Sequence, residues 1–232
     1  MNRNAATSGK EKADFCRPEL EEIRSACLKA GLAPETADSV ARSLTIYLTL
    51  LLRWRQAINL TGPKNWPDIF NGLVLDSFAL ADFIKELKLP EQPYVLDLGA
   101  GAGLPGLPLR MIWQNGRYGL VEIREKRAAF LQTCLAGLDL PGTFVLAGKA
   151  EEALSKEQGK VDLIIARAFK PWPELLAMCA SSLAPEGLAV IMSLNPPPDL
   201  LPQNWRLAAS RAYAAPSAAD KGKRYLWALA RA

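Results

Sequence analysis

Two acidic residues and a run of glycines surround one predicted turn near the middle of the chain. Asp97 closes the short apolar run that begins at Tyr94, and Glu122 closes the next such run. Glycines recur between them at positions 99, 101, 103 and 106. Glycine adopts positive φ without strain and lets a ligand approach the backbone, while the amides that open a following helix favour a negatively charged group. The sequence therefore predicts a ligand-binding loop between a buried strand and a helix.

Two ligands fit this loop. The segment Gly101-Ala-Gly103-Leu-Pro-Gly106 has the spacing of a dinucleotide site, and Glu122 follows at roughly the 20-residue offset of a ribose-binding acid. Asp97, however, places a negative charge where a pyrophosphate would lie, and Pro105 removes one amide from the turn. S-adenosylmethionine has no phosphate and carries an ammonium and a sulfonium group, so the acidic loop favours it. The candidate cofactor-binding residues of the loop are Asp97, Gly99, Gly101 and Gly103.

Composition indicates the class of protein and excludes some kinds of site. The 232 residues are half hydrophobic, which predicts one large globular domain with a smaller extension. No apolar run has membrane-spanning length and the N-terminus does not resemble a secretory signal, so we expect a cytoplasmic protein with no membrane partner. The chain has no histidine, and its four cysteines form no C-x-x-C pair. We therefore expect reduced structural thiols, no metal site, and chemistry that needs no histidine base.

Strand and helix patterns alternate through most of the chain. Helical periodicity is predicted over residues 18–31, 34–58, 73–89, 125–138 and 173–183, and strands over 94–97, 118–123, 144–147, 161–166 and 188–192. Residues 205–213 and 225–230 can form an antiparallel hairpin, because the link between them is too short for a crossover helix. The fold class is α/β, with a mostly parallel seven-stranded sheet covered by helices on both faces. We expect a disordered tail over residues 1–14, a helical extension over 15–92 and the sheet-containing domain over 93–232.

Further candidate residues fall at predicted strand ends, where ligands bind in such sheets. Glu122 has two oxygens for the two ribose hydroxyls of an adenosine, or pairs with Arg124 or Lys126. Ala150 and Glu151 would offer an amide and a polar edge to the adenine, or Glu151 is only a helix-opening acid. Arg167 could hold a methionine carboxylate or an RNA phosphate, or be buried against an acidic residue.

Basic residues are unevenly placed. Residues 201–232 contain six basic side chains, Lys223 and Arg224 among them, against one acidic side chain. Arg53 and Arg55 flank Trp54 at the end of a predicted helix. Both groups suit a nucleic-acid backbone, and ordinary solvated charges with Trp54 in the core are the alternative.

Two further polar segments have explanations other than ligand binding. Asp76 and Ser77 stand among apolar neighbours, where hydrogen bonds to the local backbone would explain them. The segment Asn195-Pro-Pro-Pro198 is similar to the Asn-Pro-Pro-aromatic loop of amino-group methyltransferases. It follows the fifth strand rather than the fourth and lacks the aromatic residue, so we interpret it as unrelated.

Several segments together resemble the bacterial small-subunit ribosomal RNA guanine-N7 methyltransferases, also called glucose-inhibited division protein B. They are Leu51-Leu-Arg-Trp with Asn59-Leu-Thr61, Leu75-Asp-Ser77, the glycine loop through Leu104-Pro-Gly106, Lys126-Arg127 and Arg167-Ala-Phe169. The resemblance spans residues 44–232 and implies the class I S-adenosylmethionine-dependent fold. It implies cofactor contacts at Gly99, Leu104, Ala150, Glu151 and Arg167, with Glu122 as the ribose ligand. Arg167 is also the candidate catalytic residue, and Arg53, Arg55, Lys126, Arg127, Lys223 and Arg224 are the candidate RNA-binding residues.

The chain departs from the family at positions that would face RNA. Gly72 and Leu73 stand where the family has Arg-His, Ser193 where it has a lysine, and Tyr225 where it has a histidine. We expect S-adenosylmethionine-dependent N7-methylation of a guanine in 16S ribosomal RNA, acting on the RNA or the small subunit as a monomer. Guanine N7 carries no proton, so this reaction needs alignment and a dry pocket but no base. The alternatives are a divergent member that binds cofactor or RNA but methylates another substrate or none, and a nicotinamide-dependent oxidoreductase.

Overall fold

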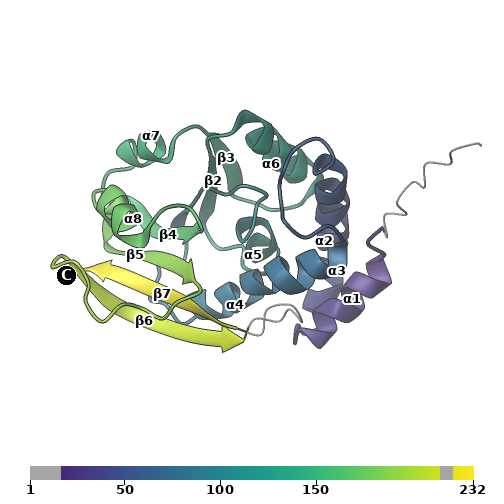
Figure 1. The fold of residues 1–232 in the computed structure, drawn as a ribbon, viewed down its shortest axis with the longest axis horizontal. Helices are drawn as coiled ribbons and strands as arrows, with labels where there is room; N and C mark the ends of the chain where they lie inside the picture. The colour runs from purple at the N-terminus through teal and green to yellow at the C-terminus, as the bar shows by residue number, and fades with distance from the viewer. Residues whose placement is uncertain (1–16, 215–221) are drawn as a thin grey trace, which may run out of the picture.

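The computed structural model describes residues 17–214 and 222–232 of the chain (Figure 1). The expected disordered tail, Cys16 and Lys221 of the basic C-terminal segment lie outside the described residues. The described cysteines, Cys27, Cys134 and Cys179, are buried free thiols, as predicted.

A seven-stranded sheet forms the centre of the protein, in the order β3-β2-β1-β4-β5-β7-β6. Neighbouring strands from β3 to β5 are parallel, whereas β7 runs antiparallel to both β5 and β6. The predicted α/β sheet with an antiparallel C-terminal hairpin is therefore confirmed. The strands are β1 Tyr94–Leu98, β2 Arg117–Glu122, β3 Thr143–Ala147, β4 Val161–Arg167, β5 Leu183–Ser193, β6 Trp205–Ala214 and β7 Lys223–Arg231.

Helices cover both faces of this sheet. They are α1 Leu20–Lys29, α2 Pro34–Trp54, α3 Trp66–Ile69, the π-helix η1 Phe70–Val74, α4 Leu75–Ile84, α5 Gly106–Ile112, α6 Glu125–Gly137, α7 Ala150–Ser155 and α8 Trp172–Cys179. Figure 1 shows the β6–β7 hairpin along one edge of the molecule and α1 and α2 at the opposite end. Pro34 opens α2, where its missing amide leaves no hydrogen bond unmade.

The alternation of side chains along each strand builds two cores. Val95 and Tyr118 pack on one face with residues of α1, α2, α4, α5 and α6, whereas Leu96 and Val121 pack on the other with α7 and α8. The first core extends from Ile23 in α1 to the strands, so the N-terminal helices and the sheet share one apolar interior.

Several element boundaries differ from the sequence expectations. Helix α2 ends at Trp54 rather than Ile58, and the helical run predicted over 73–89 is η1 followed by α4, which ends at Ile84. The helix predicted to reach residue 183 stops at Cys179, and β5 already begins at Leu183. The cause is tertiary, because Leu183 pairs with Val161 at the start of β4.

Candidate active site

The glycine loop joins β1 to α5 and is held from two sides. Gly99, Gly101 and Gly103 have φ of 72°, 57° and 80°, which glycine alone adopts readily. From α2, the buried Tyr47 hydroxyl donates to the Ala102 carbonyl at 2.8 Å. This hydrogen bond anchors the loop to the helical layer, and no sequence pattern singled out Tyr47 as a loop contact.

The two predicted carboxylates both bind amides of this loop region. Glu122 is 4% exposed, and its Oε2 accepts from the Gly101 amide at 2.8 Å. Its Oε1 accepts from the Arg124 backbone amide at 2.8 Å, so its contact with Arg124 runs through the backbone and not through the ion pair that was the alternative to ligand binding. The carboxylate thus lies directly beneath the loop where the sequence placed it.

Asp97 lies below the start of α5. It is 1% exposed, its Oδ2 accepts from the Tyr118 hydroxyl at 3.2 Å, and the Gly106 amide also donates to it. Burial raises the pKa of Asp97 to about 7, and these two hydrogen bonds partly offset the rise. Asp97 is enclosed by protein, so its geometry suits support of the loop rather than direct contact with a ligand.

The segment leaving β4 crosses close to the loop. Ala168 has φ of 48°, a left-handed conformation that is strained for a non-glycine residue. The Phe169 ring that follows packs onto Gly99, where an added Cβ would lie 2.5 Å from the ring. The structure thereby brings the predicted Arg167 and the glycine loop to the same edge of the sheet.

The predicted adenine-side residues open α7. Ala150 is buried and Glu151 is exposed at the first turn of this helix. Lys170, beyond β4, forms an ion pair with Glu151 at 3.3 Å, so the segment after β4 is tied to α7. The backbone amide of Glu151 and the hydrogen bond from Lys170 lower the pKa of this carboxyl group.

Arg167 is paired with an acidic residue, as its alternative interpretation expects, and this acidic residue is not among the predicted site residues. Its Nη2 lies 2.9 Å from Oδ2 of Asp76, whose side chain is only 2% exposed. Asp76 also accepts from the Tyr213 hydroxyl at 3.0 Å and forms an ion pair with Arg224. The expectation of local backbone bonding for Asp76 was therefore wrong, because three side chains from distant strands converge on its carboxylate.

A cavity of about 550 Å³ opens beside this cluster. Its lining includes Asp76, Arg167, Phe169, Trp172, Tyr213 and Arg224. Ser193 and Asn195 also line it, so the segment after β5 takes part in the site although its motif was interpreted as unrelated. Ser193 pairs with Tyr225 across β5 and β7, which places two of the departures from the family pattern side by side.

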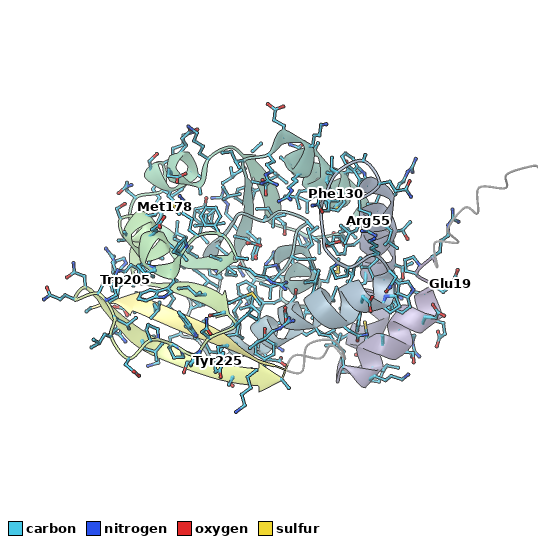
Figure 2. The ribbon with its side chains drawn as sticks, in the orientation of Figure 1. Glu19, Arg55, Phe130, Met178, Trp205 and Tyr225 are labelled. Atoms are coloured by element: carbon cyan, nitrogen blue, oxygen red, sulfur yellow. The ribbon has the colours of Figure 1, made fainter. Side chains whose placement is uncertain are left out.

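The predicted RNA-binding residues separate into two groups. The first group lies near the end of α2 and the start of α6, where Arg53 and Lys126 are exposed. In this group, Arg55 donates to the Lys64 carbonyl at 2.8 Å, and Arg127 donates to the Asn59 carbonyl at 2.8 Å. Figure 2 shows Arg55 at that end of the molecule and Tyr225 on the distant hairpin.

The second group, Lys223 and Arg224, lies in the hairpin, and one of the two differs from its prediction. Lys223 is exposed at the start of β7. Arg224, in contrast, is directed inward, where it donates to the Gly72 carbonyl at 2.9 Å and pairs with Asp76. Its guanidinium is engaged by protein acceptors and its side chain is 12% exposed, so the prediction of an open RNA-facing arginine does not match its position.

Within residues 17–214 and 222–232, no group of three or more histidine, cysteine, aspartate or glutamate residues is placed to hold a metal ion. No helix in that part of the chain is long and apolar enough to cross a membrane.

The comparison with solved structures identifies the class of fold. A structure described as a SAM-dependent methyltransferase from Aquifex aeolicus superimposes with a TM-score of 0.51 and 19% identity, covering 71% of this chain and 93% of that one. At this identity the match shows the fold alone. The fold is that of the class I S-adenosylmethionine-dependent methyltransferases, as predicted.

Sequence comparison then identifies the family. The family model of rRNA small subunit methyltransferase G matches residues 40–199. A protein named ribosomal RNA small subunit methyltransferase G from Nitratidesulfovibrio vulgaris strain DP4 is 46% identical over 209 residues, which cover 90% of this chain and 93% of that protein. One of the same name from Lawsonia intracellularis is 43% identical over 195 residues, which cover 84% and 89%. The chain belongs to the rRNA small subunit methyltransferase G family, and the predicted resemblance is confirmed.

Proposed function

We propose that this protein transfers a methyl group from S-adenosylmethionine to N7 of a guanine in 16S ribosomal RNA. The choice of cofactor rests on one observation, that buried carboxylates accept hydrogen bonds from backbone amides of the loop. The Gly101 amide donates to Glu122 and the Gly106 amide to Asp97, so amides that a pyrophosphate would need are already bound to acidic groups. An ammonium and a sulfonium are compatible with such a site, which argues against a nicotinamide dinucleotide.

The chain offers residues suited to each part of this cofactor. Glu122 lies at the end of β2 beneath the loop and would bind the ribose hydroxyls. Ala150 and Glu151 would face the adenine, and Arg167 would bind the carboxylate of the amino-acid tail. When bound, S-adenosylmethionine supplies a methyl group on a sulfonium, which an unprotonated ring nitrogen can accept without a general base.

The residues of the cavity suit a purine substrate. Phe169 and Trp172 offer aromatic faces for stacking of an extruded base, and such faces also stabilise the positive charge that the purine gains on methylation. The absence of histidine from the sequence is compatible with this reaction, because no proton has to be removed. The contribution of the chain is to orient the two reactants and to exclude water.

The substrate is proposed from the relatives and from the basic residues. The relatives at 46% and 43% identity carry the name ribosomal RNA small subunit methyltransferase G. Arg53, Arg55, Lys126 and Arg127 lie near the loop region, where a phosphate backbone would bring a base toward the cavity. We further propose that the protein acts as a monomer in the cytoplasm on 16S ribosomal RNA or the small subunit.

The test is methyl transfer to RNA that lacks the modification. The protein is incubated with methyl-labelled S-adenosylmethionine and either protein-free 16S RNA or small subunits, and the labelled nucleotide is mapped by chain cleavage at N7-methylguanine. We expect label at N7 of a single guanine. Tight cofactor binding without label in either RNA form would overturn the proposed substrate and favour a divergent member with another target.

A further inference from the structure

Asp76 is a buried acidic residue in the lining of the cavity, and it contacts residues from three other elements. It projects from α4, and its partners are Arg167 at the end of β4, Tyr213 in β6 and Arg224 in β7. Removing a buried carboxylate from water costs several kcal/mol unless its oxygens are paired. Two guanidinium groups and a phenol satisfy that requirement, so the carboxylate is held in one position.

The π-helix contributes to this arrangement. Arg224 donates from Nη1 both to Asp76 and to the carbonyl of Gly72 in η1, the latter at 2.9 Å. A π-helical turn is wider than an α-helical one and is often found at functional sites. Gly72 and Asp76 therefore present a carbonyl and a carboxylate to the same arginine, which locks η1 and α4 to β7 of the hairpin.

Arg167 uses only part of its hydrogen-bonding capacity on this cluster. Its Nη2 lies 2.9 Å from Oδ2 of Asp76, and among the described residues none accepts a hydrogen bond from its Nε or Nη1. The side chain is 21% exposed and lines the cavity next to Phe169, which packs onto the glycine loop. An arginine fixed at one nitrogen presents its remaining donors in a fixed plane, which suits a planar carboxylate.

We propose that Asp76 is a positioning residue that orients Arg167 for the carboxylate of the cofactor's amino-acid tail. This inference rests on the proposed function, in which Arg167 binds that tail. The enclosed position of Arg167 beside the loop favours a cofactor carboxylate over an RNA phosphate, because a phosphate backbone binds at exposed cations. Tyr213 and Arg224 both bind the Asp76 carboxylate, so they act on the Arg167 guanidinium through it.

The test compares two ligands that differ only in the amino-acid tail. S-adenosylhomocysteine has the tail, whereas 5′-methylthioadenosine has the same nucleoside and a thioether without it. For Asp76→Asn we expect S-adenosylhomocysteine to bind about tenfold more weakly by calorimetry, while 5′-methylthioadenosine binding stays within about twofold. Asp82→Asn is the matched control, because Asp82 lies on the same helix but is exposed and pairs with the exposed Lys85.

Two further variants keep the proposal testable if Asp76→Asn does not fold. Tyr213→Phe removes one hydrogen bond from Asp76 without touching Arg167, and we expect about threefold weaker binding of S-adenosylhomocysteine alone. Arg167→Met should lose affinity for S-adenosylhomocysteine by about tenfold or more, and adding Asp76→Asn to it should cause no further loss.

The outcomes distinguish a failure of the role inferred for Asp76 from a failure of the role proposed for Arg167. Equal weakening of both ligands in Asp76→Asn, or in Tyr213→Phe, would show a merely structural role and overturn the inference. Normal S-adenosylhomocysteine binding in Arg167→Met would overturn the assignment of Arg167 under the proposed function. Loss of RNA affinity with unchanged S-adenosylhomocysteine binding would assign the arginine to a phosphate instead and also overturn the inference.

Discussion

At the scale of single residues, carboxylates decide which ligand the loop accepts. Glu122 and Asp97 are both nearly inaccessible, yet each accepts hydrogen bonds from the backbone of the loop region. A generic glycine loop offers free amides to a phosphate, whereas here Gly101 donates to Glu122. The same glycine spacing can therefore serve two ligand classes, and the neighbouring acids distinguish them.

The buried Asp97 predicts a pH dependence of stability. Its pKa is raised from 3.8 to about 7 by burial, so between these values the folded protein holds a proton that the unfolded chain releases. This contribution to stability is fully present below the lower value and is lost as the pH rises through about 7. Asp97→Asn keeps an oxygen acceptor for Tyr118 and Gly106 but does not titrate.

Urea unfolding of both proteins across pH measures this effect. From about pH 5 to about pH 8, we expect wild type to lose on the order of 2 kcal/mol relative to Asp97→Asn. Parallel stability curves for the two proteins would show that Asp97 does not change protonation in this range.

At the scale of elements, close approach at the start of α5 fixes the loop. A Cβ at Gly106 would lie 2.5 Å from Oδ2 of Asp97 and 2.6 Å from Cδ2 of Leu120. We expect Gly106→Ala to lower the free energy of unfolding by about 1–3 kcal/mol through overpacking and to weaken S-adenosylmethionine binding. Denaturant unfolding and calorimetry measure the two effects.

Gly72→Ala is the matched control for this steric argument. A Cβ at Gly72 would meet no atom within 4 Å, and the carbonyl that binds Arg224 is retained. We expect unchanged or slightly raised stability, because alanine is favoured over glycine in helices. Similar losses in both variants would contradict the steric explanation.

The β6–β7 hairpin contacts α4 and the segment that follows it through two ion pairs of different burial. Arg224 with Asp76 is nearly enclosed, at 12% and 2% side-chain exposure, whereas Arg211 with Glu86 is at 29% and 62%. Loss of Arg224 leaves the buried Asp76 carboxylate with Arg167 as its charged partner, so part of its charge compensation is lost, whereas an exposed pair is screened by water. We expect Arg224→Met to cost about 3 kcal/mol of unfolding free energy and Arg211→Met less than about 1 kcal/mol. Equal losses in urea unfolding would contradict this ranking.

At the scale of the whole molecule, the sequence predicts the position of the glycine loop better than the contacts that hold the loop in place. The loop, Glu122 and the strand-end arginine are local patterns, and the structure places each at the carboxyl edge of the sheet. The contacts that hold them are long-range: Tyr47 and Ala102 are 55 residues apart, and Asp76 and Tyr213 are 137 apart. A polar residue in an apolar helix signalled Asp76, but only the folded chain reveals its partners.

The basic residues near α2 and α6 predict a salt-dependent interaction with RNA. Each phosphate contact releases counterions, so we expect Arg53→Ala and Lys126→Ala each to reduce the slope of log affinity against log salt by about 1. Lys160→Ala is the control, because Lys160 is exposed just before β4, at the sheet edge opposite the site. RNA titrations at several salt concentrations measure the slopes. Unchanged slopes in Arg53→Ala and Lys126→Ala would place the RNA on another face.

Calorimetric titration with S-adenosylmethionine and with NADH tests the central claim most directly. We predict that S-adenosylmethionine binds wild type, that Glu122→Ala weakens it by about tenfold or more, and that NADH does not bind at comparable concentrations. Glu152→Ala, which alters an exposed acid on α7, should bind as wild type does. Binding of NADH without binding of S-adenosylmethionine would contradict the claim that the acidic glycine loop holds a methyl donor.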